Sequence, residues 1–324
     1  MTPAVNSLPV IVLYPHSRCN CRCRMCDIWK DTGHKEISQE ALARYIEDFQ
    51  KLSVRWVVLS GGEPLMHSDL FPFCSRMRAA GIRVTILSTG LLLERDATKI
   101  VGSVDDVIVS LDGPPAVHDR IRGVPGAFNR LKDGIRSIHR HDPEFPIAAR
   151  SVVQRDNFPF LRLTASTAKD MGLHSISFLA ADVTSSAFNR PAGWPVERQE
   201  MVALSAEDLH PLEREIEALL EDWGGDPFLS DTPEKLRRIV RHYRAHLGFG
   251  EAVAPRCNAP WVSAVIEADG VVRPCFFHEP IGNAGQGLAS AVNSVEAQSF
   301  RSSLNVETNP ICKRCVCSLN WNGS

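Results

Sequence analysis

Residues 8–26 read LPVIVLYPHSRCNCRCRMC and join an apolar run to a group of four cysteines. The run Leu8–Tyr14 is rich in the β-branched and aromatic residues that favour a buried strand. Cys19, Cys23 and Cys26 follow it with the spacing CxxxCxxC, which places their thiols in the loop directly after that strand. The stretch therefore predicts a first strand whose carboxyl end carries metal-binding chemistry.

The chain continues as alternating strands and helices. Ser38 is placed to cap a helix whose apolar stripe ends at Leu52. Further strands are expected at residues 56–59, 82–87, 104–111, 147–153 and 175–179, and further helices near 69–79, 92–101, 128–139 and 160–171. Six strand–helix units in series favour a parallel sheet, which right-handed crossovers curl into a barrel. The predicted fold is α/β, a partial (βα)6 TIM-type barrel.

Three polar motifs that contain glycine follow predicted strands. They are Ser60–Pro64 (SGGEP), Ser88–Gly90 (STG) and Ser110–Gly113 (SLDG). In parallel barrels, the loops at the carboxyl ends of the strands carry the chemistry. We therefore expect these motifs and the first cysteine loop to meet at one face of the barrel.

The pattern changes beyond residue 182. Two helices are expected near 206–223 and 233–247, and the basic run Lys235–Arg244 has helical spacing that we interpret as a solvated face. The last residues hold many turn formers and the second group of cysteines. The predicted domains are a core barrel over 1–182, a helical linker region over 183–255 and a small cysteine-rich domain over 256–324.

Composition narrows the classes of function. The chain has 324 residues, 44% of them hydrophobic, and a formal net charge of −2, so it has no excess of positive charge for nucleic acid or an anionic membrane. Met1–Leu8 lacks the basic and apolar segments of a signal peptide, and no apolar run approaches the roughly 20 residues of a membrane span. A cytoplasmic protein is predicted. In that reducing compartment, ten cysteines, of which all but Cys74 lie in two dense groups, indicate metal binding or catalysis rather than disulfides. Cys74 falls on a helical apolar stripe and is expected to pack in the core.

The first group of cysteines offers an incomplete ligand set. Three thiolates within eight residues can hold three corners of a cubane cluster and leave the fourth iron free for a small molecule. The alternative is a zinc knuckle, which needs Cys21 or His16 as a fourth ligand. Arg18, Arg22 and Arg24 flank the loop and would stabilise negative charge on the thiolates or on a cluster.

The second group lies near the C-terminus. Cys257 and Cys275 flank a segment whose alternating apolar residues and turn at Gly270 predict a β-hairpin, which would bring the two thiols together. Cys312 and Cys315 add two more. Four thiolates suit a 4Fe–4S cluster or a tetrahedral zinc ion equally well.

Together these motifs resemble a known superfamily. CxxxCxxC after the first strand and GGEP after the second form the signature of radical S-adenosylmethionine (SAM) enzymes, and Arg18–Trp29 looks like their cluster loop. The spacing Cys–x12–Gly–x4–Cys from Cys257 to Cys275 resembles the SPASM domain and its shortened form, the twitch domain. The whole architecture is similar to that of 2-deoxy-scyllo-inosamine dehydrogenases.

The resemblance implies two 4Fe–4S clusters. Cys19, Cys23 and Cys26 would hold the one that binds SAM. The auxiliary cluster would be held by Cys257, Cys275, Cys312 and Cys315. A version with three ligands stays open, because Cys317 can exchange roles with Cys315.

The resemblance also implies contacts with SAM. The residues in the matching motifs are Met25, Gly61, Gly62, Glu63, Pro64, Ser88, Ser110, Asp112 and Arg122. Met25 would cover the adenine, Glu63 would accept from the amino group, and Ser88 would contact the ribose. Ser110 and Arg122 would hold the carboxylate, since an arginine fork binds carboxylates bidentately. Asp112 is either part of this site or a turn residue.

For the reaction, the resemblance implies reductive cleavage of SAM and abstraction of hydrogen from a substrate carbon. A fully ligated auxiliary cluster favours electron transfer, so we expect two-electron oxidation of a small polar metabolite. Modification of a ribosomal peptide and redox-neutral epimerisation are the alternatives among enzymes. A zinc-binding structural protein is the alternative outside them.

Catalytic candidates lie in or near the second group of cysteines. His278 and Glu279 follow Cys275 and are possible acid–base groups, and Cys317 is a possible hydrogen donor. The expected partners are a small-molecule or short peptide substrate and an external one-electron reductant such as flavodoxin or ferredoxin. No nucleic-acid or membrane partner is expected.

Overall fold

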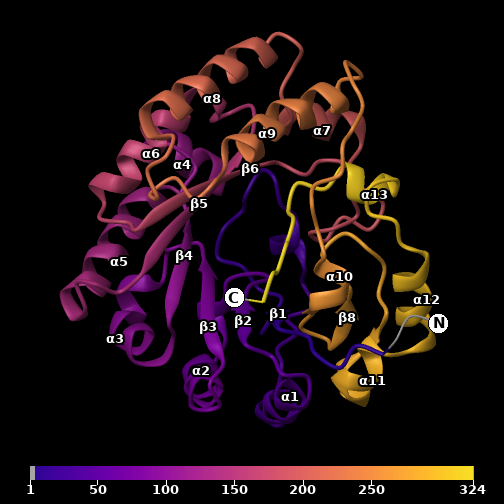
Figure 1. Ribbon diagram of the computed structural model, residues 1–324. Helices are drawn as coiled ribbons and strands as arrows, with labels where there is room; N and C mark the ends of the chain where they lie inside the picture. The colour runs from indigo at the N-terminus through magenta and orange to yellow at the C-terminus, as the bar shows by residue number, and fades with distance from the viewer. Residues whose placement is uncertain (1–3, 324) are drawn as a thin grey trace.

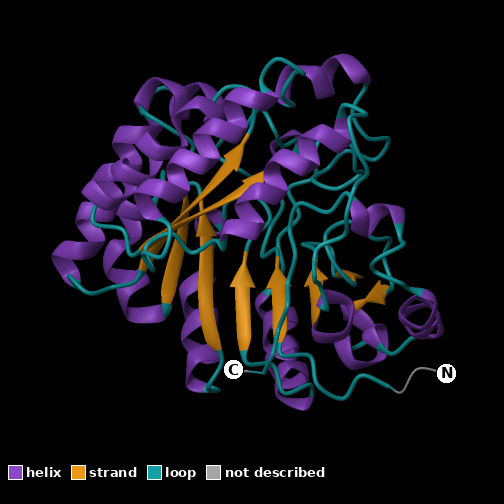
Figure 2. Cartoon of the chain, turned by 45° about the horizontal axis from the view of Figure 1, so that its top comes forward, coloured by secondary structure: helices purple, strands orange, loops and turns teal. Residues whose placement is uncertain are grey.

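A computed structural model describes residues 4–323, so residues 1–3 and 324 of the predicted end domains lie outside the described residues. Six parallel strands open the chain: β1 (Val10–Leu13), β2 (Trp56–Leu59), β3 (Arg83–Ser88), β4 (Asp106–Ser110), β5 (Ile147–Val153) and β6 (Ser175–Ala180). They stand side by side in the order β6-β5-β4-β3-β2-β1, which confirms the partial parallel barrel (Figure 1). Each of them ends in a loop at the same edge of the sheet, as the arrows in Figure 2 show.

Helices connect the strands and cover the outer face of the sheet. They are α1 (Gln39–Lys51), α2 (Leu70–Ala79), α3 (Leu93–Ser103), α4 (Pro115–Arg122), α5 (Ala127–His141) and α6 (Leu161–Asp170). Ser38 caps α1 as predicted, its hydroxyl accepting from the Ala41 amide at 3.3 Å. Cys74 on α2 is buried in the core. The short helix α4 was not expected from the sequence.

Three helices follow the barrel strands. They are α7 (Val196–Val202), α8 (Leu209–Trp223) and α9 (Pro233–His246), of which α8 and α9 match the two predicted helices. α8 packs against α6 and α9, and α9 also packs against β6. This region therefore packs beside β6, at one end of the sheet.

The C-terminal region adds strands to the same sheet. It comprises α10 (Ala259–Val262), β7 (Ser263–Ile266), β8 (Val271–Arg273), β9 (Gly282–Asn283), α11 (Leu288–Val292), α12 (Val295–Ser303) and α13 (Pro310–Lys313). β7 and β8 form the predicted antiparallel hairpin. The sequence did not indicate that β7 also pairs in parallel with β1, Val10 opposite Ser263. This pairing fixes the second group of cysteines beside the first strand.

The C-terminal segment then runs back across the open side of the barrel (Figure 1). The Asn258 side chain donates to the carbonyl of Trp321 at 2.7 Å, and the rings of Trp321 and Trp56 lie 6.4 Å apart. Among residues 4–323, no helix has both the length and the apolar character needed to cross a bilayer. The cytoplasmic location stays a prediction.

Candidate functional site

The first cysteine loop is clamped between two neighbouring segments. On one side, the Glu63 amide donates to the Arg18 carbonyl at 2.9 Å. On the other, the amides of Arg22 and Arg24 donate to the carbonyls of Arg122 and Ile121, at 2.9 and 3.0 Å. The unexpected helix α4 therefore ends against the loop and fixes its backbone.

Glycines make the first of these contacts possible. A β-carbon on Gly62 would lie 1.8 Å from the Arg18 carbonyl oxygen, and one on Gly61 would lie 2.7 Å from the Tyr14 ring. Gly61 also has φ +94°, a conformation that residues with a side chain rarely adopt. The two glycines thus serve close packing of the GGEP loop against the cysteine loop.

The thiols of the loop differ in their surroundings. A hydrogen bond from Cys21 and the nearby Arg122 guanidinium, with Nη1 3.5 Å from the thiol sulfur, lower the pKa of Cys23 to about 7. Burial raises the pKa of Cys19 and of Cys26 to about 12. Cys21 is itself buried and its pKa is raised, first through its bond to Cys23. Cys23 is therefore the thiol best prepared to act as a thiolate.

The GGEP carboxylate lies at the centre of a buried network. Glu63 is completely buried and accepts from the Ser88 hydroxyl at 3.0 Å, the Thr89 amide at 2.6 Å and the Thr89 hydroxyl at 2.7 Å. The Leu65 amide donates to it as well, at 3.1 Å. Burial raises the pKa of Glu63, and the Thr89 bonds oppose that rise. Glu63 therefore joins the ends of β2 and β3.

Arg122 and Asp112 form a buried ion pair beside Cys23. Asp112 also accepts from the Val152 amide at 3.0 Å, so it is more than a turn residue. The nearby His118 ring accepts from the Asp112 amide at 3.2 Å, and burial lowers the pKa of His118 to about 3. A positive and a negative charge are thus held together at the end of β4.

The second group of cysteines surrounds a small cavity. Its wall includes all five of these residues, Cys257, Cys275, Cys312, Cys315 and Cys317, together with His278. His278 Nε2 lies 3.4 Å from the Cys312 sulfur, and the Cys315 thiol donates to the Cys317 carbonyl at 2.6 Å. Elsewhere the wall is apolar, with Pro260, Phe277 and Ile311 among the residues that form it. Five thiols can therefore reach one space.

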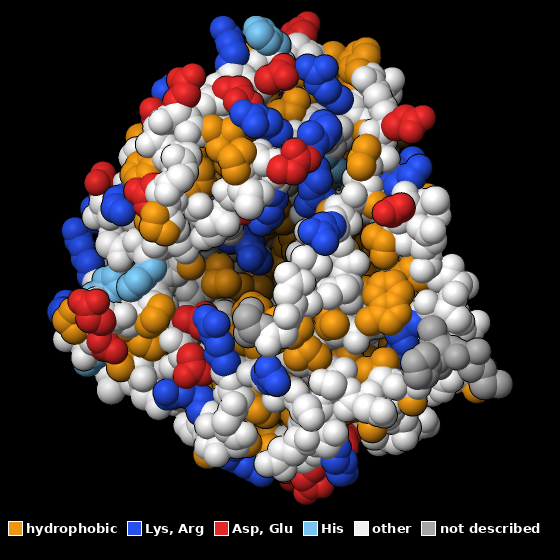
Figure 3. Space-filling view, viewed as in Figure 1, with side chains coloured by type: hydrophobic (Ala, Val, Ile, Leu, Met, Phe, Trp, Pro, Cys, Tyr) orange, Lys and Arg blue, Asp and Glu red, His pale blue; other side chains and the backbone are white. Residues whose placement is uncertain are grey.

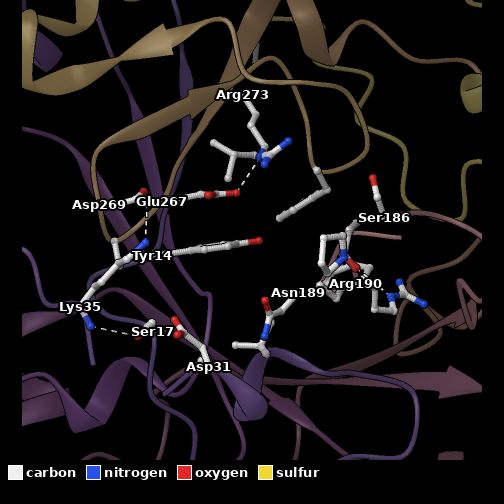
Figure 4. Close-up of a pocket in the computed structure, with 18 of the residues that line it drawn as sticks. Tyr14, Ser17, Asp31, Lys35, Ser186, Asn189, Arg190, Glu267, Asp269 and Arg273 are labelled. Carbon is white, nitrogen blue, oxygen red and sulfur yellow. Dashed lines mark hydrogen bonds and ion pairs between the residues drawn. The ribbon is translucent and has the colours of Figure 1, made fainter. Parts of the chain in front are cut away.

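A larger cavity of about 430 Å³ is lined by sequence neighbours of both groups of cysteines (Figure 4). His16, Ser17 and Gly62 border it on the side of the first loop, and Arg273 and Glu279 border it on the side of the second. The Glu267–Arg273 ion pair, 2.6 Å long, lies in its wall.

Tyr14 reaches into this cavity from the end of β1 (Figure 4). Its ring lies 6.4 Å from that of Phe276, and burial, with a contribution from Glu267, raises the pKa of Tyr14. The phenol therefore stays neutral and able to donate a hydrogen bond. Sequence reasoning missed Tyr14, although it directly precedes the cysteine loop.

Comparison with known proteins decides the family. Residues 13–152 match the radical SAM superfamily, and residues 257–316 match the iron–sulfur cluster-binding domain named SPASM. The chain contains a radical SAM domain and a SPASM iron–sulfur domain. The resemblance predicted from the cysteine and GGEP motifs is therefore confirmed.

Individual relatives cover different shares of this chain. AdoMet-dependent heme synthase of Oleidesulfovibrio alaskensis is 29% identical over 159 residues, 48% of this chain and 40% of that protein. PqqA peptide cyclase of Ruegeria pomeroyi is 25% identical over 272 residues, 82% of this chain and 66% of that protein. The chain thus matches less than half of the first relative and about two thirds of the second.

A solved structure shares the fold. Streptococcus suis SuiB bound to S-adenosylmethionine superposes with a TM-score of 0.70 at 14% identity, over 98% of this chain and 74% of SuiB. This likeness supports the barrel and its C-terminal extension. The expected likeness to 2-deoxy-scyllo-inosamine dehydrogenases stays a prediction.

The donor sets fit the cofactors of the family, which are SAM with a 4Fe–4S cluster and an auxiliary iron–sulfur cluster. Cys19, Cys23 and Cys26 would hold the first cluster, and four of the five C-terminal cysteines would hold the second. Among residues 4–323, no three ligating side chains converge tightly enough for a single metal ion. In a cubane each thiolate binds a different iron, so the sulfurs stand further apart.

The structure places the predicted SAM contacts around the first loop. Ser88 and Glu63 bond each other, and Arg122 is paired with Asp112, so these side chains already have partners before SAM is considered. Ser110 is half-buried and lies opposite Arg150 of β5, and Met25 packs against the core. Pro64 is buried at the start of a short helical turn. Their roles toward SAM stay predictions.

The three predicted catalytic residues line two different cavities. Glu279 is exposed and lines the larger cavity, of about 430 Å³. His278 and Cys317 instead line the small cavity of the second group. Of the three, Glu279 is thus the one that faces the space that also contains Tyr14.

Proposed function

We propose that this protein is a radical SAM oxidoreductase that removes two electrons from a small polar substrate. The observation that carries the proposal is the cavity of about 430 Å³, which has neighbours of the first cysteine loop in one wall and neighbours of the second group in the other. A substrate in it would lie between the two clusters. It could therefore lose hydrogen on one side and an electron on the other.

When bound, SAM and its reduced cluster would supply the radical that removes a hydrogen atom from a substrate carbon, and the auxiliary cluster would supply an acceptor for the remaining electron. The first electron comes from an external reductant, for which a flavodoxin or ferredoxin is proposed. A proton must also leave the substrate. For an alcohol, losing one hydrogen atom, one electron and one proton converts the C–OH group to C=O.

Residues that line the cavity can bind the substrate and accept the proton that it loses. Glu279, an exposed carboxylate that pairs with no cation among residues 4–323, is placed to accept the proton. Tyr14 offers a neutral hydroxyl that no described side chain engages, so it is free to bond a substrate oxygen. The pair Glu267–Arg273 supplies further polar groups. Such a wall suits a substrate with several hydroxyl or amino groups.

The ligand count of the second group supports electron transfer. Four of five cysteines saturate a cubane and leave no iron open to the substrate. A protein ligand on every iron suits a cluster that passes electrons rather than one that binds a substrate.

Modification of a peptide is the second candidate. Its support is the PqqA peptide cyclase, a relative that aligns with 82% of this chain. A peptide side chain could enter the same cavity, and the two candidates differ only in what carries the reacting carbon. Epimerisation is a third outcome, for which Cys317 would be the hydrogen donor.

The test is an anaerobic reaction with SAM, a reductant and candidate metabolites or peptides, followed by product mass. Oxidation predicts a product two mass units lighter, lost in Cys257→Ala/Cys275→Ala while some SAM cleavage persists. Cys317→Ala should leave turnover largely intact. A product of unchanged mass that carries solvent deuterium and requires Cys317 would overturn oxidation in favour of epimerisation.

A further inference from the structure

A third cavity, of about 1000 Å³, lies on another side of the second group of cysteines. Its walls are α9, the loop of residues 250–256 and the segment of residues 313–320. We call it the basic chamber. Cys315 belongs both to its wall and to the wall of the cysteine cavity, so the two spaces are neighbours.

The basic chamber is strongly cationic. Its wall contains Lys235, Arg238, Arg241, Arg256, Lys313 and Arg314, against the single carboxylate of Glu234. Figure 3 shows Lys and Arg side chains gathered around the upper part of a hollow on this face. Such a concentration of like charge is unfavourable unless anions or solvent compensate it.

The basic run on α9 is largely a solvated face, as predicted, with Arg237, Arg241 and Arg244 exposed. Arg237 and Arg244 do turn away and pair with Glu217 and Glu213 of α8, at 2.6 and 3.0 Å. The other members, Lys235, Arg238 and Arg241, line the chamber, where Lys235 pairs with Asp231 and Arg241 pairs with Glu234.

Several polar groups of the chamber lack partners. Within residues 4–323, no hydrogen bond or ion pair engages the side chains of Arg256, Lys313 or Arg314. His242 also lines the chamber, and its Nε2 atom is buried and bonded to no described residue. Unpaired donors around a concave space are what a ligand site presents.

These cations do not line the space of the auxiliary cluster. The wall of the cysteine cavity includes His278 but neither lysine nor arginine. Arg238 reaches toward it and donates to the Cys315 carbonyl at 2.9 Å. The charge of Arg256, Lys313 and Arg314 therefore faces the chamber, where it is available to a ligand.

We propose that the basic chamber binds a small polyanion that carries several carboxylate or phosphate groups. Charge-assisted hydrogen bonds from guanidinium and ammonium groups recognise both kinds of group. The volume is in the range of small-molecule sites, about 300–1000 Å³, and a globular partner could not enter it. Binding there does not depend on the oxidation proposed above.

The test is calorimetric titration of the anaerobically reconstituted holoenzyme with two probes, citrate and inorganic tripolyphosphate. We expect at least one probe to bind, with an affinity that falls as salt rises. The probe that binds more tightly identifies carboxylate or phosphate as the preferred group. Arg256→Gln/Lys313→Gln/Arg314→Gln should weaken that binding at least about tenfold.

The matched control removes the same charge elsewhere. Arg44, Arg76 and Arg130 are exposed on α1, α2 and α5, and Arg44→Gln/Arg76→Gln/Arg130→Gln should bind like the wild type. If the chamber variant fails to retain its iron, Lys235→Gln/Arg241→Gln on α9 replaces it, because neither residue adjoins a cysteine. Equal weakening in control and chamber variants, or no binding of either probe, would refute the proposal. Binding of an acidic redox protein without either probe would likewise refute it and make this face a docking surface.

Discussion

Gly62→Ala should separate the GGEP loop from the first cysteine loop. The added β-carbon would lie 1.8 Å from the Arg18 carbonyl oxygen, whereas real β-carbons essentially never approach a heavy atom within 3.0 Å. The loops must therefore part by at least 1.2 Å, the difference between these distances. The Glu63–Arg18 backbone hydrogen bond, now 2.9 Å, cannot survive that shift. Overpacking of about 1–3 kcal/mol and a lost hydrogen bond of about 1 kcal/mol give a destabilisation of about 2–4 kcal/mol.

Gly102→Ala is the matched control. Gly102 lies exposed in α3, and a β-carbon there meets nothing within 4 Å, so alanine should stabilise the helix by about 0.5–1 kcal/mol. Urea unfolding of both apo-proteins measures the free energies, and iron analysis after anaerobic reconstitution measures the first cluster. We expect Gly62→Ala to lose stability and iron, and Gly102→Ala to lose neither. Equal values for the two variants would refute the close packing of the loops.

Three further substitutions test individual roles. Arg122→Ala should weaken SAM binding by about 1.5–3 kcal/mol in calorimetry, because a charge-assisted contact is lost. Arg120→Ala, on the exposed side of the same helix, should leave SAM binding unchanged, and equal affinities of the two variants would remove Arg122 from the site. Tyr14→Phe should lower product formation but not SAM cleavage, and its free energy of unfolding should stay within about 0.5 kcal/mol of wild type. Unchanged product formation would exclude a contact between Tyr14 and the substrate. The pKa of His118 is about 3 in the folded protein and ordinarily 6.5, so the free energy of unfolding should fall by about 1.4 kcal/mol per pH unit as the pH drops below 6.5. His118→Phe should reduce that fall in an acid titration of stability, and an unchanged slope would contradict this.

Local pattern was enough to predict most of the barrel. β2 and β5 begin and end at the predicted residues, because β2 is a short apolar run and β5 alternates buried with half-buried positions. Ser38 caps α1 because its hydroxyl can reach an amide three residues on. The two cysteine motifs and GGEP led to the correct superfamily, since their order along the chain is specific.

Other features depend on contacts that spacing does not reveal. α4 has only eight residues, too few for a clear apolar period, yet its end holds the cysteine loop. β7 pairs with β1 across about 250 residues of chain, which no local signal encodes. The pairing of Arg122 with Asp112, the position of Tyr14 and the basic chamber likewise arise from tertiary packing.

The central claim is that two clusters with different roles flank one cavity, and a three-protein comparison tests it most directly. Reconstituted wild type, Cys19→Ala/Cys23→Ala/Cys26→Ala and Cys257→Ala/Cys275→Ala are assayed for iron, zinc and formation of 5′-deoxyadenosine under reducing, anaerobic conditions. We predict about eight irons in wild type and about four in each variant. 5′-Deoxyadenosine should form in wild type and in the C-terminal variant but not in the N-terminal one. Zinc in wild type, full iron in the N-terminal variant, or SAM cleavage without its three cysteines would contradict the account.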